Sequence, residues 1–561
     1  MNVSTTLLQL NRQDENKTLP FIMRRHFFGH FFTAEKLITI SVLVVLLAAA
    51  FFLRFWNIEH LPAGLYPDEA MNGVDAIHAN ETGDYQLFYP NNSGREGLFI
   101  NLQALALLLF GATIPALKLW SAIFGTATVL GIYLLAKELW HKRSVALFSA
   151  FLLTFSYWAI NFSRIGFRAI MVPFILSFSF FFFFRGLRTK SLLSFLISGI
   201  IFGLGFHTYI AFRVAPLILL IVTIGCMASY REFLKHYWRQ ALIFTGGMLI
   251  TALPLVYEFV KHPEYVSSRS ASISIFSPAV NHGHFALTLA KTLSLSLIKY
   301  TFVGDMNWRH NYPPYPLLDL VSGILFLAGF VFLLMRITLL IRKRWKYTER
   351  NRELMISLFL LGWFFTMLIP EFLTAEGLPH ALRAIGTQPV VFLIASIPLL
   401  WFGEWLRKRK LGAQIGMILF VGTVLACIPL WNVSKYFLFF ANNQNARSAF
   451  NEDFTSMAYF INTLPTDTHA YILANAGGTM IDNGLPITAQ PFLFLTHDAK
   501  RAPVEFLKPD TIIQTPAVII PQKWDDAIAE KVRLTLPKKS TVTTIPFQYT
   551  SQKNFQVIMI Q

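Results

Sequence analysis

The dominant pattern along the chain is a series of long apolar runs separated by short polar spacers. Most of the runs are close to the length that a hydrocarbon layer of about 30 Å requires of a helix. The pattern predicts eleven membrane spans: Leu37 to Leu53, Leu117 to Ala136, Val145 to Ile160, Ala169 to Phe184, Leu192 to Phe206, Val214 to Ser229, Ala241 to Tyr257, Leu317 to Ile341, Leu354 to Ile369, Pro389 to Phe402 and Leu411 to Trp431. The sequence therefore predicts a polytopic α-helical membrane protein.

The basic residues gather in every second spacer. The spacers after the second, fourth, sixth, eighth and tenth runs contain Lys137, Lys142 and Arg143; Arg185, Arg188 and Lys190; Arg231, Lys235 and Arg239; Arg336 to Lys346; and Arg407 to Lys410. Because cytoplasmic loops carry the excess of Lys and Arg, these spacers and the N-terminal segment 1–36 are predicted to lie in the cytoplasm. We expect a plasma (inner) membrane protein whose outer regions include the first loop, residues 54–118, and everything after residue 431. No cleavable signal peptide is expected.

One apolar stretch, Gly97 to Gly111, is short for a full span. Counting it as a span would place every later basic spacer outside, against the positive-inside bias. We therefore predict a helix that lies at the outer membrane surface or dips partway into the bilayer.

The tail, residues 432–561, lacks long apolar runs. It is predicted to alternate helices (Phe454 to Leu464, Trp524 to Thr535) with short strands (Ala470 to Leu473, Ala517 to Ile520, Gln556 to Ile560). We expect a small extracytoplasmic α/β domain behind a membrane module of residues 37–431.

Composition narrows the class of protein further. Hydrophobic residues make up 54% of the chain and charged residues only 14%, which excludes an ordinary soluble protein. The formal net charge of +17 does not indicate nucleic-acid binding, because the basic residues lie between apolar runs and not on a soluble face. Cys226 and Cys427 both lie inside apolar runs, so no disulfide framework is expected.

The first outer loop places two adjacent carboxylates, Asp68 and Glu69, just beyond the first span. One interpretation is a helix start, with Asp68 as N-cap and Glu69 favoured by the helix dipole. The other is catalytic, because a carboxylate at the rim of a cavity is suited to act as a general base on a hydroxyl nucleophile. The two interpretations are compatible.

This loop and its surroundings resemble a known class of enzyme. The cytoplasmic N-terminus and first span, the acidic outer loop, Arg95-Glu-Gly-Leu-Phe-Ile and Leu109-Phe-Gly-Ala-Thr-Ile-Pro-Ala-Leu-Lys-Leu-Trp are similar to the GT-C membrane glycosyltransferases. Glycosyltransferase family 39, which includes protein O-mannosyltransferases and the lipid A aminoarabinose transferase, is the nearest in pattern. The resemblance implies a polyprenyl-phosphate-linked sugar as donor, transfer at the outer face, and Asp68 as base.

The outer loops also gather cations. We predict that Arg95, Arg164, Arg168 and Arg383 bind the donor phosphate, because the arginine fork matches phosphate oxygens. The alternative for each arginine is that it snorkels to lipid headgroups. Candidate substrate contacts are Glu96, His207, Tyr209, Arg213, Asp305, His310 and His380.

No metal site and no cofactor are predicted. A divalent cation held by Asp68 and Glu69 with Asp75, His78 or Glu96 is the alternative, but no His or Asp spacing there matches a recognisable site. Arginine side chains neutralise a leaving phosphate without a metal.

The sequence therefore predicts a glycosyltransferase that acts on a lipid, glycan or protein acceptor among membrane lipids and binds no nucleic acid. Direct attack on the donor implies inverting chemistry. The alternative function is a transporter or flippase of a lipid-linked sugar. Such a protein is expected to show repeat symmetry and broken helices at the membrane midplane. In this sequence the unusual residues lie instead in the outer loops. A non-catalytic receptor is a third interpretation, which leaves the outer cations without a role.

Overall fold

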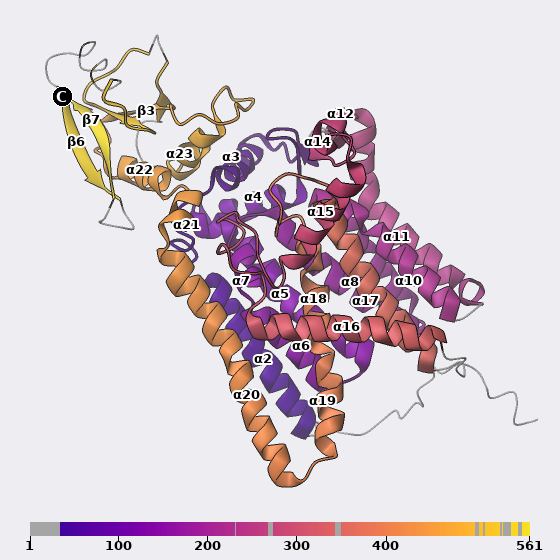
Figure 1. Cartoon of the computed structure of the whole chain (residues 1–561). Helices are drawn as coiled ribbons and strands as arrows, with labels where there is room; N and C mark the ends of the chain where they lie inside the picture. The colour runs from indigo at the N-terminus through magenta and orange to yellow at the C-terminus, as the bar shows by residue number, and fades with distance from the viewer. Residues whose placement is uncertain are drawn as a thin grey trace, which may run out of the picture.

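The apolar runs form helices that pack side by side into one bundle, with a small sheet domain at one end (Figure 1). The computed structural model describes residues 34–229, 232–267, 273–342, 349–499, 504–508, 511–527, 540–547 and 553–561, with residues 530 and 534. Segment 1–33, Arg231, residues 343–348 and most of the predicted helix over 524–535 lie outside the described residues.

The bundle contains helices at all eleven predicted spans. They are α2 (Ala34–Phe55), α5 (Ile114–Trp140), α6 (Arg143–Phe155) with α7 (Tyr157–Ser163), α8 (Met171–Thr189), α9 (Leu192–Leu204), α10 (Pro216–Ser229), α11 (Phe233–Lys261), α16 (Leu320–Arg342), α17 (Glu349–Phe372), α18 (Gln388–Ser396) with α19 (Pro398–Arg407), and α20 (Leu411–Ser434) continued by a π-helical turn, Lys435–Phe440.

Length separates these helices into clear and marginal spans. Within the described residues, nine helices are long and apolar enough to cross a membrane, and the α6–α7 pair, bent by 61°, makes a tenth. The helical stretch Leu192–His207 has only sixteen residues, about 24 Å of helix, which is short of the hydrocarbon thickness. The multi-pass architecture is thus confirmed, and the count of eleven stays a prediction.

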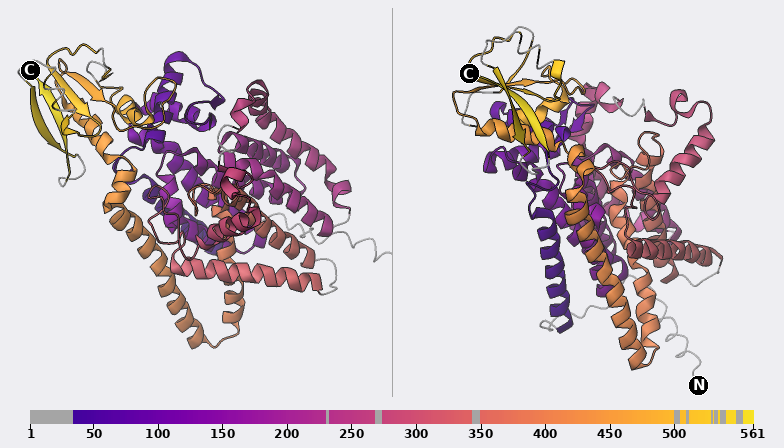
Figure 2. Two further views of the ribbon diagram at one scale, coloured as in Figure 1. Left: turned by 45° about the horizontal axis from the view of Figure 1, so that its top comes forward. Right: turned by 60° about the vertical axis from the view of Figure 1, so that its left-hand side comes forward.

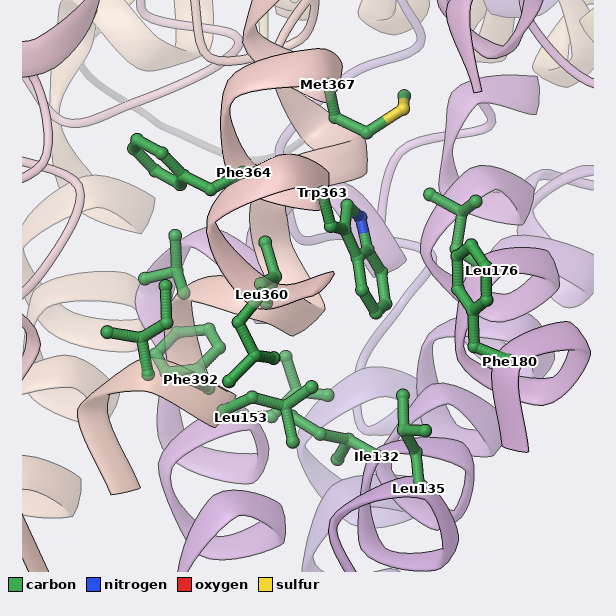
Figure 3. Packing of buried hydrophobic residues seen from close by; sticks show 14 of the residues in the cluster. Ile132, Leu135, Leu153, Leu176, Phe180, Leu360, Trp363, Phe364, Met367 and Phe392 are labelled. Carbon is green, nitrogen blue, oxygen red and sulfur yellow. The ribbon is translucent and has the colours of Figure 1, made fainter. Parts of the chain in front are cut away.

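The core of the bundle is aromatic and aliphatic. Trp363 and Met367 of α17 face Leu176 and Phe180 of α8, as Figure 3 shows. The Trp363 and Phe180 ring centroids lie 5.1 Å apart, and the indole Nε1 donates a hydrogen bond to the carbonyl of Gly386 at 2.9 Å. The buried indole is therefore satisfied as well as packed, which fixes α17 against the segment before α18.

Three of the five basic spacers, those after the second, fourth and eighth spans, come together in the fold. Arg188 Nε lies 2.5 Å from Glu138 Oε1, and Arg352 Nη2 donates to the carbonyl of Leu139 at 2.8 Å. These contacts join the spacers after the second and fourth spans to the start of α17. These three basic spacers therefore lie at the same end of the helical bundle.

The first outer loop folds into α3 (Pro67–Thr82), a two-stranded hairpin of β1 (Phe88–Tyr89) and β2 (Arg95–Glu96), and α4 (Leu98–Phe110). The predicted short helix over 97–111 is present as α4, whose thirteen residues extend about 20 Å and are too few to cross the bilayer.

Three short helices follow in the region after α11: α12 (Glu264–Ser267), α14 (Pro278–Asn281) and α15 (Phe285–Ile298). The sequence pattern predicts no helix in that region, because it contains no apolar run of span length.

The tail forms α21 (Gln444–Ala449), α22 (Glu452–Thr463), α23 (Gln490–Leu495) and a five-stranded sheet. The sheet order is β4 (Glu505–Phe506), β3 (His469–Leu473), β5 (Ala517–Pro521), β7 (Asn554–Ile560), β6 (Ser540–Pro546). Strand β3 pairs in parallel with β4 and β5, and β7 pairs antiparallel with β5 and β6. The predicted helix over 454–464 and three predicted strands are confirmed, whereas β4 and β6 are additional to the prediction.

The tail domain packs on the first outer loop. Figures 1 and 2 place α23 beside α3, with α22 on the other side of α23, at the end of the bundle opposite the α19–α20 turn. Phe494 of α23 lies directly over Gly73 of α3, where even a Cβ atom would overlap its ring. The glycine thus permits the close approach that buries Phe494 completely.

Candidate active site

A cavity of about 430 Å³ opens between the first outer loop and the span ends. Its walls come from α3, the β1–β2 hairpin, the segment that leads into α8, the segment that leads into α10, α12 and the end of α17 with the loop that follows. The polar and charged lining residues include Asp68, Asn72, Asn92, Arg95, Glu96, Arg168, Tyr209, Arg213, His380 and Arg383. Eight of the thirteen residues singled out from the sequence therefore share one cavity.

Asp68 reaches the cavity from the first turn of α3. The helix begins at Pro67 with Tyr66 as N-cap, so the alternative in which Asp68 caps the helix is wrong. Asp68 Oδ1 accepts a hydrogen bond from Asn92 Nδ2 at 2.7 Å, and the side chain is half-buried. The hairpin thus orients the carboxylate while one side of it stays open to the cavity.

Glu69 is not a cavity residue. It is fully buried, its Oε2 accepts a hydrogen bond from the Gly166 amide at 2.8 Å, and Lys118 Nζ lies 4.0 Å from the same oxygen. Burial raises the pKa of Glu69, although the nearby Lys118 opposes this shift. The structure therefore places Glu69 outside the cavity, in a contact that ties α3 to the segment after α7.

Glu96 lies between two arginines at the centre of the cavity wall. Arg168 Nε donates to Glu96 Oε2 at 2.8 Å, and Arg213 Nη2 lies 3.6 Å from Glu96 Oε1. The Arg168 guanidinium also lies over the Tyr209 ring, 5.4 Å from its centroid. Two guanidinium groups share one carboxylate here, so this array carries one net positive charge facing the cavity.

Arg95 and Arg383 are each engaged by a carboxylate of their own. Arg95 Nη2 lies 2.5 Å from Asp75 Oδ2, and its Nη1 donates to Asn72 Oδ1 at 2.6 Å. Burial raises the pKa of Asp75, whereas Arg95 lowers it. Arg383 Nη2 lies 2.9 Å from Glu376 Oε2. Both arginines line the cavity, but neither adds unbalanced charge as the Arg168 and Arg213 pair does.

Arg164 lies away from the cavity, contrary to the prediction. Its Nη1 donates to the carbonyl of Leu53 at 2.9 Å, and its Nη2 donates to the carbonyls of Trp56, Asn57 and Leu61 at 2.7, 3.2 and 3.0 Å. These carbonyls lie at and just after the end of α2, where a helix leaves its last carbonyls without partners. The structure therefore places Arg164 as a helix-capping side chain outside the cavity lining.

His207 also lies outside the cavity lining, because its ring is turned toward α11. Its Nε2 lies 2.7 Å from the Thr251 carbonyl, a contact that joins the end of α9 to α11. The structure therefore places His207 in a contact between two helical segments and not among the residues that line the cavity.

Asp305, His310 and His380 form a cluster behind the cavity. His310 Nδ1 lies 3.0 Å from Asp305 Oδ2, and the His310 and His380 ring centroids lie 4.8 Å apart. Burial lowers the pKa of His310, and burial together with the neighbouring His310 lowers the pKa of His380 well below its ordinary value. Two imidazoles therefore stand beside one carboxylate.

This cluster is the one group of His, Cys, Asp and Glu in the described part of the chain whose ligand atoms all lie within 4.8 Å of one another. It offers the nitrogen and oxygen ligands that suit a divalent transition metal. The set considered from the sequence, Asp68 and Glu69 with Asp75, His78 or Glu96, does not gather in this way within those residues. Only His380 of the cluster also lines the cavity.

Sequence reasoning missed several residues that shape the site. Asn72 and Asn92 orient Arg95 and Asp68, and Thr374 and Glu376 hold Arg383. An asparagine in a loop carries no local signal of its hydrogen-bond partner. The one local signal in the sequence is that Glu376 and Arg383 lie in the same short loop after α17, which favours an ion pair between them.

Part of the chain matches a protein family. Residues 98–257 match the family model described as dolichyl-phosphate-mannose-protein mannosyltransferase. No curated protein matches the chain by sequence.

Solved structures show the fold of the whole chain. The crystal structure of ArnT from Cupriavidus metallidurans bound to undecaprenyl phosphate matches with a TM-score of 0.52 at 14% identity, covering 93% of this chain and 98% of that chain. The apo state of the same protein matches with a TM-score of 0.52 at 13% identity over the same shares. The chain is thus a multi-pass membrane protein with the GT-C glycosyltransferase fold, similar to ArnT and, over residues 98–257, to the dolichyl-phosphate-mannose-protein mannosyltransferases.

Proposed function

We propose that the protein is a glycosyltransferase that moves a sugar from a polyprenyl-phosphate donor to an acceptor nucleophile at the outer membrane face. The fold is that of ArnT, which was crystallised with undecaprenyl phosphate, and the family model over 98–257 is named for transfer from dolichyl phosphate. Both names point to a sugar carried on a lipid phosphate. The acceptor is a lipid, a glycan or a protein.

The observation that carries this proposal is the Arg168–Glu96–Arg213 array in the same cavity as Asp68. A donor phosphate that approaches the array meets one net positive charge and two planar guanidinium forks. Glu96 holds both forks in place before the donor arrives, so little reorganisation is needed when the phosphate binds.

The lipid chain of the donor has a matching wall. The cavity extends from the charged residues to apolar side chains, among them Val214, Ile369 and Leu373 at or beside the span ends and Phe276 in the loop between α12 and α14. A phosphate at the array therefore leaves the polyprenyl chain running along apolar surface toward the bilayer, which is the arrangement that an amphipathic donor requires.

The chemical step is a direct displacement. The Asp68 carboxylate takes the proton of the acceptor O–H (or N–H) as that atom attacks the anomeric carbon, and the bond from this carbon to the phosphate oxygen breaks. The bonding electrons leave with the polyprenyl phosphate, whose charge Arg168 and Arg213 stabilise. One displacement inverts the anomeric configuration. The proton, the broken bond and the charge of the leaving group are all accounted for in this step without a metal or cofactor.

The orientation in the membrane belongs to the same proposal. The end of the bundle that carries the basic spacers is assigned to the cytoplasm by the positive-inside bias, and the cavity and tail domain lie at the other end. The protein then acts on the extracytoplasmic side of the plasma membrane, with its N-terminus inside.

A reconstituted assay tests the function. Purified protein is mixed with radiolabelled polyprenyl-phosphate sugars and an envelope extract, without any nucleotide sugar, and the labelled product is identified. Asp68→Asn should lower turnover by about 10²- to 10⁴-fold, the usual effect of losing a general base, with donor binding retained. Asp84→Asn, an exposed acid of the same loop outside the cavity, is the matched control. Near-normal turnover of Asp68→Asn would refute the assignment and make Glu96 the next candidate.

A further inference from the structure

A second cavity, of about 500 Å³, lies at the other end of the bundle from the candidate active site. It is bounded by the end of α5, the start of α6, the second half of α16, the start of α17 and α19. The proposed transfer reaction gives this second cavity no role, because its described lining residues are all different from those of the cavity at the candidate active site.

The charge of the lining is strongly positive. Among the described lining residues, Lys142, Arg336 and Arg352 face a single acid, Glu353, so these residues carry an excess of two positive charges. Arg336 pairs with Glu353, and Arg352 Nη2 donates to the carbonyl of Leu139 at 2.8 Å. An anion that enters therefore meets cations already held in position by the protein.

The remainder of the lining is apolar and faces outward. Met335, Leu339 and Trp401 line the cavity with 57%, 52% and 48% of their surfaces exposed. In a spanning bundle, such side chains at the ends of α16 and α19 contact lipid chains, and a tryptophan at this depth is typical of the membrane interface. The ring of Phe332 packs edge-on against Trp401, with the centroids 3.8 Å apart, and supports this apolar rim.

We propose that this cavity is a binding site for an anionic phospholipid of the leaflet that meets the basic end of the bundle. The headgroup phosphate lies among Lys142, Arg336 and Arg352, and the acyl chains pass over Met335, Leu339 and Trp401. A phosphate headgroup joined to two apolar chains matches a basic cavity with an apolar, outward-facing rim. A soluble anion matches only the basic half.

Native mass spectrometry of the full chain tests the proposal, with phosphatidylglycerol added as the probe. The wild-type protein should retain one phosphatidylglycerol with an affinity about tenfold or more above that of the double variant Lys142→Gln/Arg336→Gln, because two headgroup charges are lost. The matched control is Lys190→Gln/Lys410→Gln, two exposed lysines at the same end of the bundle that lie outside the cavity. It should bind as the wild type does.

Two further arms decide the class of ligand. Zwitterionic phosphatidylcholine should not displace the bound lipid, and sn-glycerol 3-phosphate, which has the phosphate but no chains, should not displace it at matched concentration. Displacement by the soluble phosphate would overturn the lipid assignment. Equal binding by the wild type and the double variant, or an equal loss in the control, would overturn the site itself.

The folding of the variants is controlled separately. Lys142 is exposed at the start of α6, so Lys142→Gln alone provides a folded variant, for which a smaller loss of phosphatidylglycerol is expected. Arg336→Lys keeps the charge and should restore most of the binding that Arg336→Gln removes. Since these measurements record lipid binding and not sugar transfer, their outcome is independent of the proposed activity.

Discussion

Replacing Arg168 with lysine tests the phosphate array most directly. The change keeps the positive charge but removes the Nε–H that donates to Glu96 Oε2 at 2.8 Å, together with the planar fork. The side chains of Arg168 and Glu96 are only 19% and 2% exposed, so the lost hydrogen bond is largely shielded from water. Lysine also offers the donor phosphate a single point contact in place of the two-pronged contact of a guanidinium, and a hydrogen bond to a charged group contributes about 1.5–3 kcal/mol. We therefore expect kcat/KM for the donor to fall by about 10- to 150-fold.

The matched control is Arg164→Lys, in the same segment of the chain. The Nη donors of Arg164 bind four carbonyls at and just after the end of α2, so a lysine at position 164 would leave some of these carbonyls unpaired. Each lost hydrogen bond costs about 1 kcal/mol. The expected result is a lower melting temperature with normal donor kinetics per folded molecule.

The assay measures initial rates of transfer over a range of donor concentrations, with thermal unfolding followed on the same samples. Unchanged donor kinetics in Arg168→Lys would return Arg168 to a snorkelling or packing role. A donor defect in Arg164→Lys equal to that in Arg168→Lys would show that the structural distinction between the two arginines is wrong.

Three further predictions address the rest of the molecule. Phe494→Ala should destabilise the junction of the tail domain and α3 by about 3–5 kcal/mol, which a lower melting temperature would show. Donor binding should persist, because no described residue of the tail lines the cavity. A loss of donor binding in the folded variant would contradict this prediction. Burial lowers the pKa of His310 and His380, so the unfolded chain binds more protons than the folded protein, and the stability of the fold should fall as the pH drops below about 6.5. In a series of melting temperatures measured at different pH, His380→Asn should reduce this loss of stability. An unchanged slope of melting temperature against pH would contradict the role of His380. Cysteines introduced at positions 142 and 190 should resist a membrane-impermeant reagent added outside sealed cells, whereas one at position 84 should react; labelling at position 142 would reverse the proposed orientation.

The helical architecture follows from the amino-acid sequence alone. Hydropathy is a property of consecutive residues, and burial in a bilayer imposes it over the whole length of a span, so the runs from Leu37 to Trp431 indicate their helices without any tertiary information. The alternation of basic spacers likewise separated the two ends of the bundle. The loop that carries Asp68 was recognised because its acidic residues and the Arg95 motif lie close together in the chain.

Which of the candidate side chains share the cavity depends on the three-dimensional packing and cannot be predicted from the sequence. Asp68 and Glu69 are neighbours in sequence, but successive residues of a helix point about 100° apart, so one faces the cavity and the other is buried beside Gly166. Arg164 and Arg168 are equally basic and four residues apart, yet the chain turns between α7 and α8 and sends Arg164 to the end of α2. The direction of a side chain depends on the elements packed around it, and these lie as many as a hundred residues away, beyond the reach of any local pattern.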